Sequence, residues 1–294
     1  MKILHIWDQA GVACIIAKYQ KKMGHDVKVI RRTNYDPYGI YEFYEDLVCF
    51  TPNEEFLHVC LREASVADIV HIHSRIDAFF YLNKKLNKNP KIVMHFHGTE
   101  LRGIKQNQKI WPLRNFFVSS IKSYRRSIVR KRSNALVEKF ADKVLVSTPD
   151  LLSHVNKGSV LLHNPVDTEH FNEKQNHKSN ERAFTFATES KSVKNWIISI
   201  CKKNRIDNLD VIDRTKNPMK YFAMPDFLRE FGIYIDILYI NDRLIKSNSK
   251  TGLESLACGL RVIDHSGEPK YGLPLVHQPL NVVQKLERIY QEIL

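Results

Sequence analysis

The chain has 294 residues, 43% of them hydrophobic and 26% charged, which is typical of a soluble globular protein with room for two ordinary domains. No apolar run approaches the ~18 residues that a membrane-spanning helix needs. The opening residues 1–8 are too short and too polar for a signal peptide, which predicts a cytoplasmic protein. The five cysteines form no C-x-x-C pair, which argues against a disulfide framework or a cysteine zinc site. The formal net charge of +13 favours anionic partners.

Short apolar runs alternate with longer amphipathic segments through the first half of the chain. The expected strands are rich in Ile, Val, Leu or Phe without strict alternation, and they lie at 2–6, 26–30, 69–72, 91–96, 143–147 and 160–162. Such runs are typical of a parallel sheet that is covered on both faces. Residues 11–23 have a helical pattern that stops at Gly24-His25. The repeated strand–helix–strand unit predicts an open, doubly wound α/β sheet.

A polar stretch separates this half from a second alternating set. Asn164-Pro165 predicts a turn and 172–182 is mostly charged, so we expect the linker within 164–182. The expected strands of the second half lie at 183–188, 209–212, 234–239 and 260–264. Residues 280–294 carry apolar side chains at helical spacing and predict a closing amphipathic helix. The expected domains are therefore 1–165 and 166–279, with the helix 280–294 packing toward the first domain.

Four stretches, in this order along the chain, resemble a known family. They are Gln9–Ala13, His95–Arg102, Val146–Leu152 with Leu162–Asp167, and Thr251–Ile263. Together they resemble the retaining nucleotide-sugar glycosyltransferases of group 1, or family 4, whose GT-B fold has two Rossmann-like domains facing each other across a cleft. The resemblance covers most of the chain. It implies transfer of a sugar, with retention, from a nucleoside diphosphate sugar to a hydroxyl acceptor such as a lipid-linked or growing glycan. It implies no essential metal or cofactor, and the sequence contains no D-x-D triplet.

The resemblance assigns the donor site to the second domain. Glu254 matches a glutamate that is expected to accept hydrogen bonds from both ribose hydroxyls of the donor. Thr251 and Gly252 lie in the loop and helix start whose N–H groups are expected to face the donor diphosphate. The family's other glutamate is replaced by Lys246, which can pair with a phosphate but cannot accept a hydrogen bond from a sugar hydroxyl.

The family's basic pair for the diphosphate follows the first strand of the second domain. Lys194 matches the usual lysine, whereas Glu189 stands at the position of the usual arginine. Because Lys191 lies on the same loop, we expect it to take the place of that arginine and to neutralise charge on the departing diphosphate.

In the first domain, His97 ends the fourth expected strand, at the carboxyl edge where α/β sheets bind ligands. The resemblance gives His97 a catalytic place beside the transferred sugar, where an imidazole can donate to a hydroxyl or share a proton. Gly11 lies in the turn after the first strand, where a glycine permits close approach of a ligand. Gly11, Glu100 and Arg102 are expected to line the acceptor and leaving-phosphate loops.

Residues 111–140 combine apolar residues at helical spacing with many basic residues and no acidic residue before Glu138. A basic amphipathic helix of this kind can lie on an anionic leaflet, which predicts a peripheral protein of the cytoplasmic membrane face. The expected membrane face is basic and consists of Arg125, Arg126, Arg130, Lys131 and Arg132. The alternative is that the apolar stripe packs on the sheet while the basic face is simply solvated.

Three other functions remain open at this point. His71/His73 and His95/His97 each lie at positions i and i+2, which share one face of a strand, and two such pairs can bind a metal for hydrolysis. A nucleotide-sugar epimerase of the GT-B type would share the nucleotide site. A nucleic-acid-binding protein would suit the charge, but the sequence has no zinc finger, RNA-binding motif or helix-turn-helix signature, so no nucleic-acid partner is expected.

Overall fold

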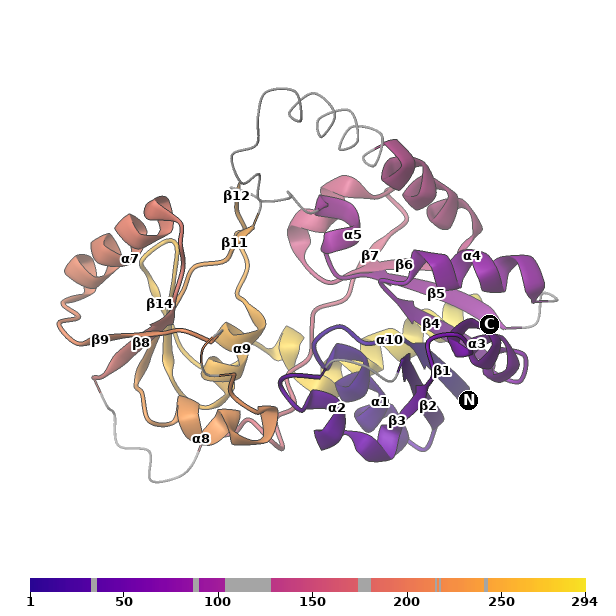
Figure 1. The fold of residues 1–294 in the computed structure, drawn as a ribbon, viewed down its shortest axis with the longest axis horizontal. Helices are drawn as coiled ribbons and strands as arrows, with labels where there is room; N and C mark the ends of the chain where they lie inside the picture. The colour runs from indigo at the N-terminus through magenta and orange to yellow at the C-terminus, as the bar shows by residue number, and fades with distance from the viewer. Residues whose placement is uncertain are drawn as a thin grey trace. The chain divides into compact units, whose positions relative to one another are not determined.

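The computed structural model describes residues 1–32, 36–86, 90–103, 128–173, 181–214, 216, 218–240 and 243–294. The chain divides into two compact units, each built around its own sheet (Figure 1). Unit 1 consists of Met1–Thr33, Leu47–His163 and Lys285–Leu294, and unit 2 consists of Asn34–Asp46 and Asn164–Gln284. The predicted boundary at residue 165 and the predicted packing of the closing helix stay predictions.

Unit 1 contains a seven-stranded sheet of order β3-β2-β1-β4-β5-β6-β7, and all its neighbouring strands are parallel. The strands are β1 (Lys2–Ile6), β2 (Asp26–Arg32), β3 (Val48–Thr51), β4 (Ile69–His73), β5 (Lys91–Phe96), β6 (Lys143–Val146) and β7 (Val160–Leu161). The helices include α1 (Val12–Lys22), α3 (Phe56–Ala64), α4 (Ile76–Lys85) and the short α5 (Thr99–Arg102). Residues 128–140 are also helical. This order reverses between β1 and β4, which marks the topological switch point where such sheets bind ligands.

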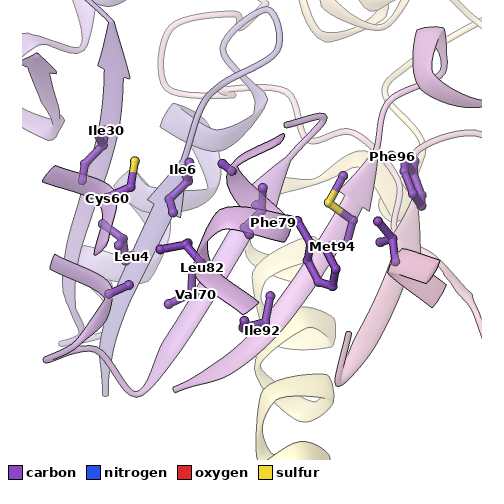
Figure 2. Packing of buried hydrophobic residues seen from close by; sticks show 14 of the residues in the cluster. Leu4, Ile6, Ile30, Cys60, Val70, Phe79, Leu82, Ile92, Met94 and Phe96 are labelled. Carbon is purple, nitrogen blue, oxygen red and sulfur yellow. The ribbon is translucent and has the colours of Figure 1, made fainter. Parts of the chain in front are cut away.

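The two faces of this sheet differ in chemistry. One face packs on α3 and α4 through a buried apolar cluster, part of which Figure 2 shows, including Leu4, Ile6, Val70, Met94, Phe96, Phe79 and Leu82. Because side chains alternate along a strand, the residues between these positions face the other way. His5, His71 and His95 occupy such positions and are fully buried on the opposite face.

Unit 2 contains a five-stranded sheet of order β14-β13-β10-β8-β9, parallel except for β14. The strands are β8 (Ala183–Phe186), β9 (Leu209–Ile212), β10 (Ile233–Asp236), β13 (Arg261–Asp264) and β14 (Pro269–Lys270), with a separate pair β11 (Tyr239–Ile240) and β12 (Arg243–Leu244). The helices are α2 (Ile40–Phe43), α7 (Lys191–Asn204), α8 (Met224–Leu228) and α9 (Lys250–Ala257), and α10 (Pro279–Ile293) runs on into unit 1. The strand order reverses between β8 and β10, which is the switch point of this unit.

Most predicted elements are confirmed, including the helix after β1 and the closing helix α10. β3 was not predicted, since Cys49 and Phe50 are exposed and the strand has no continuous apolar run. The strand predicted at 234–239 ends earlier, at Asp236, because the chain leaves the sheet there to form the β11–β12 hairpin. The doubly wound α/β prediction is confirmed in both units.

Candidate functional site

In unit 2, the N-terminus of α9 packs closely against the carboxyl end of β10. Ser249 caps α9 by accepting a hydrogen bond from the Gly252 N–H at 3.0 Å. The Ser249 N–H in turn donates to Oδ2 of the buried Asp236 at 2.8 Å, and burial raises the pKa of that carboxyl group. A Cβ at Gly252 would lie 2.1 Å from the same Oδ2 atom, so only glycine permits this approach. Gly252, predicted as a donor-binding residue, therefore also has a packing role.

We expect Gly252→Ala to destabilise unit 2 by about 3 kcal/mol, because the added methyl group would overlap the Asp236 carboxylate. Urea unfolding followed by circular dichroism measures this change. Gly158→Ala is the matched control, since a Cβ there meets nothing within 4 Å; it should change stability by less than about 0.5 kcal/mol. Equal effects of the two substitutions would contradict the packing role of Gly252.

Glu254 lies one turn further along α9 and is only 4% exposed. Its Oε1 atom lies 3.6 Å from the Lys250 ammonium, which also sits over the Tyr221 ring at 5.2 Å from the centroid. Burial raises the pKa of Glu254, and the charges of Lys250 and Arg214 act in the opposite direction. The structure therefore holds a buried carboxylate beside the Lys250 ammonium, close to the start of α9, where the charge of Arg214 also acts on it.

Arg214 follows β9 and is held between two aromatic rings. Its guanidinium carbon lies 5.0 Å from the Tyr38 ring centroid and 4.7 Å from that of Phe186. Its Nε atom is buried and has no hydrogen-bond partner among the described residues. Arg214 was not predicted, because the family motif directs attention to the loop after β8. The signal that was available is Glu189, which leaves the usual arginine position without a positive charge.

The predicted lysines occupy more open positions. Lys191 and Lys194 are exposed in the first turn of α7, directly after β8, and Ser190 caps that helix by accepting a hydrogen bond from the Val193 N–H. Lys246 is exposed in the loop between β12 and α9. Thr251 is buried in the first turn of α9. The structure thus brings Lys191 and Lys194 to the β8 edge, while the cations that influence Glu254 are Lys250 and Arg214.

In unit 1, five histidines gather on the sheet face opposite the apolar cluster. The in-register pairs His5↔His71 and His73↔His95 place four of them on adjacent strands, and His97 follows β5. His5 Nδ1 lies 3.0 Å from His73 Nε2, and His73 Nδ1 lies 3.0 Å from His97 Nε2. His71 and His73 share one face of β4, as expected, whereas His97 lies one residue beyond the end of β5, with its ring centroid 4.2 Å from that of His95. His5 joins them because of the β1–β4 register, which the sequence does not display.

Helices cover this histidine cluster from the other side. His5 Nε2 is 2.7 Å from Gln20 Oε1 of α1, and His71 Nδ1 is 2.7 Å from the Tyr290 hydroxyl of α10. Burial lowers the pKa of His5 to about 4 and that of His97 to about 3. Burial also lowers the pKa values of His71, His73 and His95 well below their usual range. All five side chains are therefore neutral at physiological pH.

The same cluster is where a metal would be held. Ring nitrogens of His5, His71 and His73 lie within 4.8 Å of one another, as do those of His73, His95 and His97. Both ring nitrogens of His5 and of His73 already take part in hydrogen bonds, so a bound metal would have to replace these hydrogen bonds. The five histidines form a neutral hydrogen-bonded array whose last member, His97, lies at the carboxyl edge of β5.

The predicted acceptor loops are held by contacts within unit 1. Asp8 accepts hydrogen bonds from the N–H groups of Gly11, Ala13 and Cys14, so its carboxylate caps α1. Arg102 forms a fork to Asp150, with N–O distances of 2.8 and 2.9 Å, and also donates to Thr148. Glu100 accepts from the Gly98 N–H at 3.0 Å. The Gly11 turn thus faces an internal anion, and Arg102 braces its own loop.

The basic helix is described only from residue 128 onward, so Arg125 and Arg126 lie outside the described residues. Arg130 packs against Gly103, where an added Cβ would overlap its guanidinium group. Lys131 and Arg132 are exposed. The large apolar residues of this helix that are also exposed are Val129 (63%), Leu136 (45%) and Phe140 (48%). Within the described part of the chain, the structure contains no helix with the length and apolarity to span a bilayer.

Comparison with known proteins agrees with this architecture. The family model for glycosyltransferase family 4 matches residues 11–170, which is more than half of the chain. The structure of an α-glucosyltransferase with UDP and a 13-mer DNA is similar, with a TM-score of 0.57 and 12% sequence identity. The alignment covers 100% of this chain and 89% of the α-glucosyltransferase chain. Sucrose-phosphate synthase from Thermosynechococcus elongatus matches 100% of this chain and 90% of its own at 10% identity, with a TM-score of 0.51. No curated protein sequence matches the chain.

The structural matches are too distant in sequence to show more than the fold, which is that of two Rossmann-like units of the GT-B class. The family model, by contrast, covers Gly11 and α1, the strands β4 and β5 that carry His71, His73 and His95, and the loop after β5. The chain therefore belongs to glycosyltransferase family 4 and is an enzyme that transfers a sugar from a nucleotide sugar.

Proposed function

We propose that the enzyme transfers a sugar, with retention of the anomeric configuration, from a nucleoside diphosphate sugar to a hydroxyl group of a glycan or lipid-linked acceptor. The observation that carries the donor half of this proposal is the buried Glu254 carboxylate, which lies 3.6 Å from the Lys250 ammonium and is also influenced by the charge of Arg214. In its ionised form, a carboxylate can accept hydrogen bonds from both hydroxyls of a ribose. The nearby cations suit the diphosphate that is joined to that ribose.

The roles in the donor site follow from charge and position. Glu254 accepts from the ribose, while Arg214 and Lys194 bind the diphosphate and stabilise the negative charge that develops as it leaves. Lys191, at the start of α7, and Lys246, in the loop before α9, are further basic residues of the proposed donor site. Thr251 and Gly252 form the first turn of α9. Arg214 would thereby replace the arginine that Glu189 displaces. We propose no metal in this step, because side-chain cations supply the positive charge.

His97 is the residue of unit 1 that we assign to the reacting sugar. It ends the hydrogen-bonded chain that starts at Gln20, and burial keeps it neutral. A neutral imidazole can exchange a hydrogen bond with a sugar hydroxyl without adding a charge that would oppose the positive charge developing on the sugar. We keep Gly11, Glu100 and Arg102 as residues of the acceptor loops, in which Glu100 and Arg102 fix the loop conformation.

Product analysis tests this proposal. The protein is incubated with UDP-, GDP-, ADP- and CMP-sugars and a mixed glycan and polyprenol acceptor pool, and the products are followed by ¹H and ³¹P NMR. We expect release of one nucleoside diphosphate together with a glycoside whose anomeric configuration equals that of the donor. A glycoside of inverted configuration would contradict retention. A free isomerised sugar would instead establish the epimerase alternative, and release of sugar to water alone would contradict transfer to an acceptor.

We further propose that the helix at 128–140 binds an anionic membrane surface, which would bring a lipid-linked acceptor to unit 1. Its exposed side includes three large apolar residues together with Lys131, Arg132 and Lys139. Apolar side chains of this kind can enter the headgroup region. Each basic residue near an anionic surface adds about 1 kcal/mol of attraction.

We expect the variant with Lys131, Arg132 and Lys139 changed to glutamine to sediment with phosphatidylserine liposomes about 100-fold less tightly than the wild type, from three charges at ~1 kcal/mol each. The matched control changes Lys21, Lys84 and Lys85, which are exposed elsewhere in unit 1, and it should bind as the wild type does. Equal binding by all three proteins would show that this helix is not the membrane anchor.

A further inference from the structure

Unit 1 has a second cluster of functional groups, at the switch point between β1 and β4. Trp7 directly follows β1, Arg75 lies two residues after β4, and Arg31 and Arg32 are the last residues of β2. All four therefore lie at the carboxyl edge where doubly wound sheets bind their ligands. No sequence motif singled them out, and neither the donor site nor the His97 chain uses them.

The backbone at this point is unusual. Trp7 (φ 72°), Ala10 (φ 55°) and Ser74 (φ 62°) are three of the four described non-glycine residues with positive φ. Such conformations are unfavourable for L-residues and are retained where the surrounding structure enforces them, often around ligands. The Ser74 hydroxyl is also buried without a hydrogen-bond partner among the described residues. Both chain reversals that flank the switch point are thus held in strained form, and an unused donor lies beside them.

Three guanidinium groups surround the Trp7 ring. Their carbons lie 4.0 Å (Arg31), 4.8 Å (Arg75) and 5.7 Å (Arg32) from its centroid, and those of Arg32 and Arg75 each lie 5.1 Å from the Phe56 centroid. An aromatic face attracts a guanidinium group and holds its plane. The Trp7 and Phe56 rings thereby hold the three guanidinium groups close together against the repulsion between their positive charges.

Two carboxylates lie among these three cations. Asp77 forms a fork with Arg75 and lies 4.0 Å from Arg32. Asp8 uses its carboxylate to cap α1, and its carbonyl oxygen accepts a hydrogen bond from Arg31 at 2.6 Å. Among the described residues, three guanidinium groups thus stand beside two carboxylates, one of which already caps α1. The side chains of Arg75 and Arg32 are 14% and 29% exposed, so a ligand can reach them.

We infer that Arg31, Arg32 and Arg75 form a phosphate-binding site and that the acceptor of the transferred sugar carries a phosphate group. Asp77 already engages the Nε and Nη2 atoms of Arg75, so a phosphate ester would be bound by the Arg32 guanidinium group, the Nη1 atom of Arg75 and the Ser74 hydroxyl, with Arg31 adding positive charge. A phosphate bound here lies at the switch point of unit 1, on the carboxyl edge that also carries His97. The inference rests on the proposed sugar transfer and adds the chemical class of the acceptor. The phosphate can belong to a lipid or to a water-soluble sugar.

The test uses full-length protein labelled with ¹⁵N in the arginine Nε position and saturated with the nucleoside diphosphate that binds most tightly. Butyl phosphate is then titrated, and the Nε–H signals of Arg31, Arg32 and Arg75 are followed by NMR. We expect these three signals to move together, and we expect Arg75→Gln and Arg32→Gln each to weaken the apparent affinity at least about 10-fold, which corresponds to the loss of one charge-assisted hydrogen bond. Arg62→Gln, which removes a 72% exposed arginine on α3, is the control and should bind as the wild type does.

Signals that stay still, or an Arg75→Gln variant that folds and binds as the wild type does, would overturn the inference. Failure of every nucleoside diphosphate to bind in the first step would instead remove the proposed function. Phosphatidic acid vesicles form a second arm. If the protein binds the vesicles more tightly than butyl phosphate, and Arg75→Gln loses this binding, the phosphate belongs to a lipid. If the protein binds both equally, the phosphate belongs to a soluble ester.

Discussion

Replacing Glu254 by glutamine should weaken the binding of the donor nucleotide about 10- to 100-fold, while the protein remains folded. The substitution preserves shape but removes the negative charge that we propose accepts hydrogen bonds from the donor ribose. It also leaves Lys250 and Arg214 without their shared carboxylate. Calorimetric titration with UDP, GDP and ADP measures the affinity, and thermal unfolding verifies the fold. Unchanged affinity for every nucleotide that the wild type binds would remove Glu254 from the site.

The same carboxylate predicts a pH dependence of donor binding. Because burial raises the pKa of Glu254, the group becomes protonated as pH falls, at a pH above its ordinary value of 4.5. Protonation removes charge from an acceptor, so donor affinity in the wild type should fall in that range. In Glu254→Gln the affinity should not change with pH over the same range. A parallel decline in both proteins would assign the pH dependence to another group.

Acid should unfold unit 1 steeply, because five buried histidines are neutral in the folded state. In the unfolded chain their pKa returns to about 6.5, whereas in the folded protein it is about 4 for His5 and about 3 for His97, with the other three also lowered. The stability that depends on these groups is present above pH 6.5 and is lost as pH falls below it. Each proton contributes ~1.4 kcal/mol per pH unit, so five approach ~7 kcal/mol per pH unit, comparable with the whole stability of a domain.

We expect the free energy of unfolding of unit 1, measured in urea at pH 7.5, 6.5, 5.5 and 5.0, to fall steeply over the last two steps. His95→Phe supplies the sharp comparison, since both ring nitrogens of His95 are buried without a partner among the described residues. This variant should be at least as stable as the wild type at pH 7.5 and should lose stability less steeply, by about one proton. Substitution of the exposed His154 by glutamine should leave the profile unchanged. A flat profile in the wild type would contradict the neutral cluster.

The sequence predicted the elements whose signal is local. The apolar runs identified β1, β5 and β9 with correct bounds. For β1 and β5 the reason is that a strand covered on both faces is continuously hydrophobic, whereas β9 is a partly exposed edge strand. The ordered motifs indicated the family, which the family model shows, and they singled out Glu254, which the structure buries beside Lys250. Where a strand is half-exposed, as with β3, the same rule gives no signal.

The features that the sequence did not reveal depend on contacts between distant residues. Residues 36–46 belong to unit 2 because Tyr44 donates to Asp167 and the Tyr221 N–H donates to Tyr38, and neither pairing follows from a local pattern. Arg214 reaches Tyr38 only through that arrangement. His5 joins the other histidines through strand register.

The arginine cluster around Trp7 is a further feature that no local sequence pattern predicts. Its basic members lie at the ends of apolar runs, at 31–32 and at 75. Arg75 stands 43 positions after Arg32, and the three arginines belong to no known motif. Only the strand order β2-β1-β4 makes those ends neighbours. Sheet topology is therefore the information that turns separate basic residues into a candidate site.

Binding of nucleotide sugars to the wild type and to Glu254→Gln tests most directly whether Glu254 holds the donor. A thermal-shift screen with UDP-, GDP-, ADP- and CMP-sugars exploits the fact that a ligand of the folded state raises the melting temperature. We expect at least one nucleoside diphosphate sugar to stabilise the wild type, and we expect the same ligand, at the same concentration, to stabilise Glu254→Gln much less. No shift with any nucleotide sugar, or equal shifts in the two proteins, would contradict that role of Glu254.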